Sequence, residues 1–285
     1  MKNKFNKIGL GTAQFIKGYG ISEDKKRINK ILKQLPSNIN LIDTSSVYGD
    51  AYKNIRNLKK NLNIVTKIVI QSKHLNNFSK KRVFSIINKN IKTLNKKSIY
   101  GLLIHNPIIL KNKNFEKLIL CFDEIKKKFN IKKIGVSIYN KQDIDFIFHK
   151  WTPDIIQLPL NVFDRRLLRN GFIKKVKKKG VEIHCRSCFL QGLLLQDSVN
   201  LKFKKWTNLF QKWDKFCIKN DITKLEASII FLKNLKLNYL IVGVDSINQL
   251  KEVSNVIKNK KTMKFPKNIS SNSLKLIDPR LWSNL

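Results

Sequence analysis

The chain has 285 residues, of which 42% are hydrophobic, and it carries a formal net charge of +39. This length allows one sizeable core, which we place in a single domain over residues 1–285, and no apolar run approaches the roughly 18 residues that span a membrane. The N-terminal segment Met1–Phe5 lacks the apolar stretch of a signal peptide. We therefore expect a cytoplasmic protein without a membrane partner.

The excess positive charge is almost all lysine, and it is spread over every predicted helix. Runs such as Lys174–Lys179 and Lys258–Lys261 fall where helix faces should be solvated. A nucleic-acid site would more often combine clustered arginine with interleaved aromatic residues. We predict weak nonspecific binding at low salt but no specific nucleic-acid partner, and a nucleic-acid-associated protein remains the alternative that the charge suggests.

One alternation organises the whole chain: a short β-branched run ends in polar residues or glycine, and an amphipathic stretch follows. Both faces of these runs are apolar, which is typical of a parallel sheet covered by helices. The runs predicted to be strands are Lys7–Leu10, Asn40–Asp43, Asn63–Lys67, Tyr100–His105, Lys133–Ser137, Asp154–Gln157, Val181–Arg186 and Tyr239–Gly243.

The segments between these runs have helical periodicity. Their apolar residues recur at i, i+3 and i+4, as in Val83, Ile86, Ile87, Ile91 and Leu94 and in Phe115, Leu118, Ile119, Phe122, Ile125 and Phe129. Thr223 with Glu226 and Ser246 with Gln249 match capping boxes at helix starts.

Eight strands that alternate with about eight helices predict an α/β protein with the (β/α)8 TIM-barrel fold. A doubly wound open sheet is the competing architecture. It would normally carry a glycine-rich dinucleotide loop after its first strand, but Gln14 stands where the third glycine belongs. The barrel is therefore favoured.

The cysteines do not indicate a disulfide framework, because four in a chain of this length are too few and too scattered. Cys185 and Cys188 form a C-x-x-C beside His184, but no second ligand pair accompanies them. We expect two small side chains that pack at a strand end, and we predict no metal site.

Four polar residues lie at or just beyond the C-terminal ends of three consecutive predicted strands: Asp43, Tyr48, Lys67 and His105. In a parallel barrel the C-terminal strand ends share one rim, where active sites lie. Tyrosine donates a proton with an ordinary pKa near 10, and a nearby ammonium stabilises the phenolate. A carboxylate can hold that ammonium, and an imidazole can hydrogen-bond a carbonyl oxygen. Each residue alone also fits a structural role, but their joint placement favours a site that protonates an oxygen.

The motifs that contain these residues resemble the aldo-keto reductase family, and bacterial members most closely. The matching segments are Gly9-Leu-Gly-Thr-Ala-Gln, Leu41-Ile-Asp-Thr-Ser-Ser-Val-Tyr-Gly, Thr66-Lys67, Leu103-Ile-His-Asn-Pro, Gly135-Val-Ser, Gln157 with Asn161, Ser187 to Leu193, and Gly243. The resemblance implies reduction of an aldehyde or ketone, sugar-like compounds included, with NADPH or NADH. It implies that Tyr48 is the general acid, that Lys67 supports it, that Asp43 pairs with Lys67, and that His105 orients the carbonyl.

The resemblance also implies a set of cofactor-binding residues: Ser137, Gln157, Arg186, Ser187, Phe189, Gln191, Gly192, Gly243, Asp245 and Gln249. Three positions depart from the family pattern. Ile138 replaces an asparagine that often contacts the carboxamide, and Arg186 replaces a tyrosine that often stacks on the nicotinamide. Gln249 stands where NADP-preferring members often have an arginine, and Asp245 is a carboxylate near the expected ribose.

We therefore expect a monomer that binds a nicotinamide cofactor and a small carbonyl substrate. The alternative is a regulatory protein on the same scaffold that binds the cofactor with little turnover. The intact set of four residues argues against that alternative, because a regulator need not keep all of them.

Overall fold

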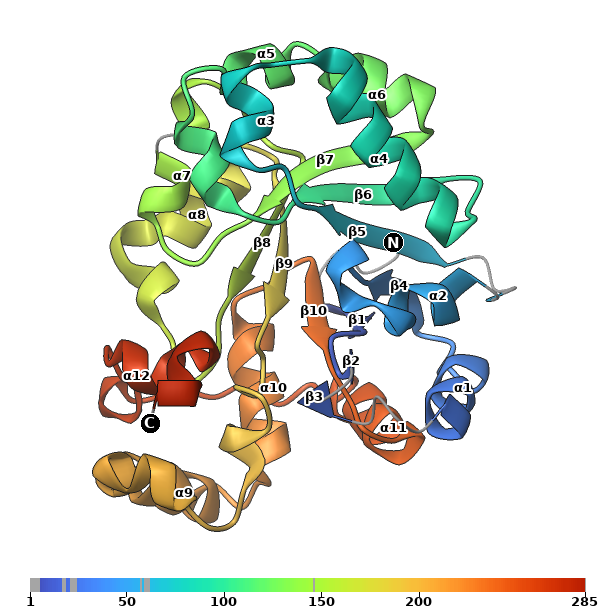
Figure 1. Ribbon diagram of the computed structural model, residues 1–285. Helices are drawn as coiled ribbons and strands as arrows, with labels where there is room; N and C mark the ends of the chain where they lie inside the picture. The colour runs from blue at the N-terminus through green and yellow to red at the C-terminus, as the bar shows by residue number, and fades with distance from the viewer. Residues whose placement is uncertain are drawn as a thin grey trace.

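The architecture is a closed barrel of parallel strands surrounded by helices (Figure 1). The computed structural model describes residues 6–16, 19–20, 25–56, 58, 62–145 and 147–284. The barrel strands are β1 (Lys7–Gly11), β4 (Ile39–Asp43), β5 (Asn63–Ile68), β6 (Ile99–Ile104), β7 (Ile131–Ser137), β8 (Ile155–Pro159), β9 (Glu182–Arg186) and β10 (Tyr239–Val242). Each pairs in parallel with its neighbours in this order, and β1 closes the barrel against β10. The predicted TIM barrel is confirmed.

The strand predictions agree with the structure to within two residues at each end. His105 and Gly243 were expected to close strands, and each lies one residue beyond, after β6 and β10. His105 is still tied to the sheet, because its backbone N–H donates to the carbonyl of Ile68 over 2.9 Å. The rim positions of these residues are therefore preserved.

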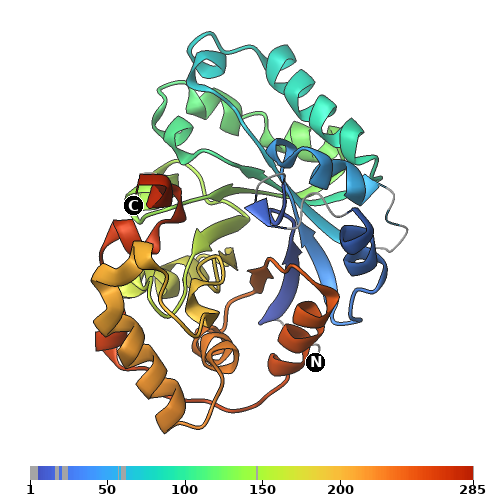
Figure 2. The same ribbon diagram turned by 60° about the horizontal axis from the view of Figure 1, so that its bottom comes forward.

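The helices pack around the outside of the barrel (Figures 1 and 2). They are α1 (Lys25–Lys33), α2 (Asp50–Arg56), α3 (Ser72–Asn76), α4 (Lys80–Leu94), α5 (Phe115–Ile119), α6 (Phe122–Lys128), α7 (Gln142–Asp145), α8 (Phe172–Lys178), α9 (Thr207–Lys219), α10 (Lys224–Asn234), α11 (Ile247–Val256) and α12 (Leu274–Ile277). In both views α9 and α10 lie on the side opposite α3 to α6.

One predicted helical segment is divided. The apolar periodicity from Phe115 to Phe129 predicts a helix, but the structure has α5 and α6 with a break at Leu120 and Cys121. The N–H of Cys121 bonds the carbonyl of Leu118 over 3.0 Å, three residues back, so the chain tightens there. Phe115 and Phe122 stay buried on both sides of the break. The periodicity reports the buried face correctly and does not detect the change in hydrogen bonding.

The structure also contains a small antiparallel hairpin that was not predicted. It pairs β2 (Phe15–Ile16) with β3 (Tyr19–Gly20), directly after the first barrel strand. Strands of two residues are too short to show an alternating pattern, so the sequence carries no signal for them.

Large side chains fill the barrel interior, and they form a compact cluster of Leu41, Val65, Leu103, Ile155, Tyr239 and Ile241. Gly101 faces this cluster and leaves room for it, because a Cβ atom at this position would lie 2.7 Å from Cδ1 of Ile155. At the end of the barrel where the strands begin, Lys133 pairs with Glu182 over 2.7 Å. The Tyr100 hydroxyl donates to the same carboxylate over 2.9 Å. Interior packing and this polar network close one end, so ligands enter from the other.

The two predicted capping boxes have different outcomes. At the start of α10, the Thr223 hydroxyl accepts from the N–H of Glu226, and the Glu226 carboxylate accepts from the N–H of Thr223, as predicted. At α11 the Ser246 hydroxyl accepts from the N–H of Gln249 over 3.2 Å. The Gln249 side chain instead accepts from the N–H of Asp245 over 2.7 Å. The second box is therefore only half formed, and Gln249 also holds the residue before the cap.

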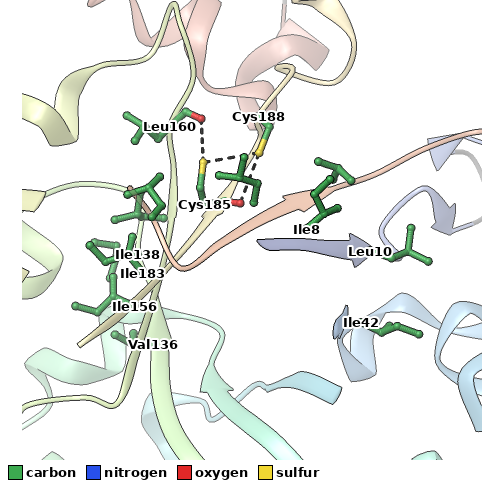
Figure 3. Packing of buried hydrophobic residues seen from close by; sticks show 14 of the residues in the cluster. Ile8, Leu10, Ile42, Val136, Ile138, Ile156, Leu160, Ile183, Cys185 and Cys188 are labelled. Carbon is green, nitrogen blue, oxygen red and sulfur yellow. Dashed lines mark hydrogen bonds between the residues drawn. The ribbon is translucent and has the colours of Figure 1, made fainter. Parts of the chain in front are cut away.

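Cys185 and Cys188 are free, buried thiols whose sulfur atoms lie 3.8 Å apart in the hydrophobic core (Figure 3). Cys185 donates to the carbonyl of Leu160 over 3.2 Å, and burial raises its pKa well above the ordinary value. They pack as expected. In the part of the chain that the structure describes, no group of three or more histidine, cysteine or acidic side chains is arranged to hold a metal ion. None of the described helices is long and apolar enough to cross a bilayer.

Candidate active site

Three adjacent strands bring the four predicted catalytic residues to one rim. Asp43 is the last residue of β4, Lys67 lies near the end of β5, and His105 follows β6. Tyr48 ends a 3₁₀ turn, Ser46–Tyr48, just beyond β4, and its N–H bonds the carbonyl of Ser45 over 3.0 Å. Because β4, β5 and β6 are neighbours in the barrel, these groups meet although they are far apart in sequence.

Asp43 and Lys67 form a buried ion pair. The Lys67 ammonium lies 2.5 Å from Oδ1 of Asp43, and the side chains are 2% and 6% exposed. The ammonium also donates to the carbonyl of Thr44 over 3.2 Å. Burial alone would lower the pKa of Lys67, but the charge of Asp43, the nearby Tyr48 and the hydrogen bond to Asp43 outweigh it, and the net effect is a raised pKa. Lys67 is therefore a cation at neutral pH.

Gln157 shares the carboxylate of Asp43 with Lys67. Its Nε2 donates to Oδ2 of Asp43 over 2.7 Å, and the side chain is completely buried. Its Oε1 atom is buried and has no hydrogen-bond partner among the described residues. A buried acceptor without a partner is costly. This oxygen is therefore suited to a ligand group that donates a hydrogen bond.

Tyr48 and His105 lie above this pair. The Lys67 ammonium is 5.5 Å from the centroid of the Tyr48 ring. The rings of Tyr48 and His105 are 6.3 Å apart at an angle of 82°. Burial, and then the charge of Lys67, lower the pKa of His105 to about 4, against the opposite effect of Asp43. The imidazole is neutral at pH 7, and Ser45 contacts its Nδ1 over 3.3 Å.

A single cavity of about 1310 Å³ contains all four residues. It continues from the barrel mouth along the loop after β9 to the start of α11. Every cofactor-binding residue predicted from the sequence lines it: Ser137, Gln157, Arg186, Ser187, Phe189, Gln191, Gly192, Gly243, Asp245 and Gln249. The volume exceeds that of most drug-sized pockets and suits a dinucleotide together with a small substrate.

The chain matches the family model described as "Aldo/keto reductase family" over residues 7–271. It belongs to the aldo/keto reductase family. The protein is therefore an NAD(P)H-dependent oxidoreductase that acts on carbonyl groups, as the sequence motifs suggested. No curated protein sequence gives a significant match.

Solved structures of this family share the fold of the chain. Aldo-keto reductase AKR11C1 from Bacillus halodurans, in its holo form, is 15% identical, with 93% of this chain and 91% of that chain covered and a TM-score of 0.72. The glycerol dehydrogenase AKR11B4 from Gluconobacter oxydans is 17% identical, with coverage of 93% and 89% and a TM-score of 0.65. An aldo/keto reductase from Klebsiella pneumoniae, in complex with NADP and acetate, is 14% identical, with coverage of 92% and 92% and a TM-score of 0.66.

In this aldo/keto reductase the loop after β9 has an unusual backbone. Ser187, Leu190 and Gln191 have φ values of 58°, 48° and 54°, in the left-handed region that side chains other than glycine seldom adopt. Asn161, two residues after β8, holds this loop, because its Nδ2 donates to the carbonyl of Ser187 over 3.0 Å. Strained backbone of this kind concentrates at ligand-binding sites. The hydrogen bond from Asn161 thus helps to fix the conformation of this loop.

Arg186 lines the cavity, but its guanidinium stacks on a protein side chain, Tyr139. Its guanidinium lies 4.3 Å from the centroid of the Tyr139 ring, and Nη2 donates to the carbonyl of Ile138 over 3.2 Å. The guanidinium of Arg280 lies 3.5 Å from the same ring centroid. Ile138, where the family often has an asparagine, thus contributes its backbone to hold Arg186.

Several cavity residues were not predicted. Tyr139 follows β7 by two residues, so its place after a strand end was a usable signal. Four acidic residues that were not predicted also line the cavity, from the middle of α9, the α9–α10 connection, the start of α10 and α11: Asp214, Asp221, Glu226 and Glu252. The capping box of Thr223 and Glu226 predicts a helix start, but it does not indicate a position in the cavity. The folding of these helices against the barrel brings the four residues there.

Proposed function

We propose that this aldo/keto reductase reduces the carbonyl group of a small or sugar-like aldehyde or ketone to an alcohol, with Tyr48 as the general acid. One observation carries the proposal above all: the buried pair of Asp43 and Lys67 places a cation 5.5 Å from the Tyr48 ring, in a cavity open to substrate. A phenol beside a fixed ammonium is suited to give up its proton.

Each residue has a separate task in this proposal. Tyr48 donates its phenolic proton to the carbonyl oxygen as negative charge develops there, and the ammonium of Lys67 stabilises the phenolate that remains. Asp43 keeps that ammonium charged and in place. His105, which is neutral at pH 7, hydrogen-bonds the carbonyl oxygen and orients it. Holding these groups in position before the reaction lowers the barrier, because no reorganisation is then needed.

The cavity also fits the nicotinamide cofactor of the family. Ser137 and Gln157 are register partners on β7 and β8, and the unpartnered Oε1 of Gln157 is an acceptor for the N–H of a carboxamide. When bound, the reduced nicotinamide, from NADPH or NADH, supplies the hydride that the carbonyl carbon accepts. The loop Ser187–Gly192 and the start of α11 hold the remainder of the dinucleotide in this proposal.

The decisive test is Tyr48→Phe, assayed with a panel of small aldehydes, ketones and sugars. We expect kcat to fall by about 10²–10⁴-fold, the usual contribution of a general acid. The Kd for reduced cofactor, from tryptophan fluorescence, should change little, since the hydroxyl acts in the chemistry. Tyr100→Phe is the matched control, because it removes the same hydroxyl at the closed end of the barrel. It should keep its kcat.

Two results would contradict the proposal in different ways. Wild-type turnover by Tyr48→Phe would show that another group protonates the oxygen. Tight cofactor binding by the wild-type protein without turnover of any carbonyl compound would support the regulatory alternative.

A further inference from the structure

The part of the cavity away from the barrel mouth is acidic, although the protein as a whole has a net charge of +39. Its acidic lining consists of Asp197, Asp214, Asp221, Glu226, Asp245 and Glu252, and Lys224 is the one basic side chain among the described lining residues there. The lining of this part of the cavity is therefore negatively charged, opposite in sign to the net charge of the protein. The contrast matters because the bound ligand experiences the nearest charges most strongly.

Lys224 does not offset these carboxylates for a ligand. Its ammonium lies 2.9 Å from Oδ1 of Asp214 and 3.6 Å from Oδ1 of Asp197. The other two cations that line the cavity, Lys67 and Arg186, lie at the barrel mouth. Within the described ranges, the distal part of the cavity thus has no basic side chain that is not already paired with carboxylates.

Asp245 is the carboxylate best placed to act on a ligand. It lies directly before the N-cap residue of α11, and its Oδ1 atom is buried without a hydrogen-bond partner in the described structure. Its backbone is held in place, since Gln249 accepts from its N–H over 2.7 Å. A helix N-terminus otherwise favours a phosphate. In this protein Ser246 caps that end, and Asp245 places a carboxylate directly before the cap.

The place of the nicotinamide end in the cavity determines where the adenosine half of the cofactor lies. In the proposed function, the carboxamide binds at Gln157, so the adenosine half must lie in the distal part of the same cavity. A ribose 2′-hydroxyl can donate to an unpartnered carboxylate, whereas a 2′-phosphate beside that carboxylate is repelled. An acidic residue beside the ribose therefore favours NADH, and a basic residue there favours NADPH.

We propose that the protein selects NADH over NADPH, with Asp245 as the residue that determines the choice. The proposal rests on the proposed function, since it requires a nicotinamide cofactor in this cavity. The carboxylate of Asp245 accepts a hydrogen bond from the adenosine ribose, and the acidic lining of the distal cavity excludes the additional phosphate.

The test is equilibrium binding of NADH and NADPH, measured by isothermal titration calorimetry without substrate. The wild-type protein should bind NADH at least about tenfold more tightly than NADPH at low salt, and the ratio should shrink at about 0.15 M ionic strength. Asp245→Asn keeps the shape and one acceptor oxygen but removes the charge. It should tighten NADPH binding several-fold and change NADH binding little. Asp123→Asn, an equal change of charge on the exposed face of α6, should leave both affinities unchanged.

The outcomes separate this proposal from the one on which it rests. Equal or tighter binding of NADPH by the wild-type protein overturns the selectivity and leaves the carbonyl reductase intact. A parallel loss of both affinities in Asp245→Asn would show that Asp245 only supports the local structure, and it would overturn the assignment. Failure of both nucleotides to bind overturns the cofactor site itself, and the selectivity with it.

Discussion

Replacing Asp43 by asparagine should destabilise the protein strongly, because the substitution leaves the Lys67 ammonium in a buried site without its counter-charge. Asp43 also receives a hydrogen bond from Gln157 on its second oxygen. Asparagine has only one carbonyl oxygen, so its NH₂ group would face one of the two donors, the Lys67 ammonium or Nε2 of Gln157. The substitution preserves size and shape, so the effect isolates charge and hydrogen bonding.

The magnitude follows from the geometry of the pair. At an effective dielectric constant of about 20, two unit charges 2.5 Å apart attract each other by about 7 kcal/mol. Breaking one side of a buried pair costs about 3–5 kcal/mol in practice. The loss is smaller than the attraction because desolvation already opposes the pair. We expect a decrease of about 3–5 kcal/mol in the free energy of unfolding, and a lower pKa of Lys67, since burial is then less opposed.

The assay is urea unfolding at pH 7 followed by circular dichroism. Glu116→Gln is the matched control, because Glu116 pairs with Lys150 over 2.6 Å but the side chains are 61% and 33% exposed. Exposed pairs contribute about 0–1 kcal/mol. Lys67→Met completes a double-mutant cycle with Asp43→Asn, in which we expect coupling of about 2 kcal/mol or more.

The reasoning is refuted if Asp43→Asn costs no more than Glu116→Gln. Additive losses in the cycle would also contradict it, since they would mean that Asp43 and Lys67 contribute independently.

Three further predictions address stability. The pKa of His105 is about 4 when folded, against about 6.5 when unfolded. The unfolded state therefore binds more protons between these values, so up to about 3 kcal/mol of stability is lost as the pH falls from 6.5 to 4. Urea midpoints at pH 7 and 4.5 measure this loss, and His105→Asn should reduce the difference. Gly135→Ala should lower the free energy of unfolding by about 3 kcal/mol or more. The added Cβ would collide with the carbonyl oxygen of Ile155 and lie 2.7 Å from Cδ2 of Leu103. A melting temperature equal to that of the wild type would contradict this close packing around Gly135. Thr223→Ala removes the α10 cap and should cost about 1 kcal/mol by calorimetry, and an unchanged melting temperature would show that the cap contributes nothing.

Local pattern sufficed for the strands and for the positions of Asp43, Lys67 and His105 at the barrel rim. Each barrel strand is a short apolar run, and Asp43 and Lys67 stand at or next to strand ends in the sequence as they do in space. Parallel topology alone then places those ends on one rim. The capping box at Thr223 is equally local, because its two partners are three residues apart.

Contacts between distant segments could not be read from the sequence. Gln157 and Asp43 are 114 positions apart, and their hydrogen bond depends on the closure of the barrel. The stacking of Arg186 on Tyr139 likewise requires the ends of β7 and β9 to converge.

The sequence by itself thus determined the fold class, the strand ends and the residue types at the rim, because neighbours along the chain set amphipathic periodicity. Only the tertiary structure decided that Asp245 shares a cavity with Asp221 and Glu226. Those residues come from separate segments, and the packing of α10 and α11 against the closed barrel, rather than any local pattern, sets the distance between them.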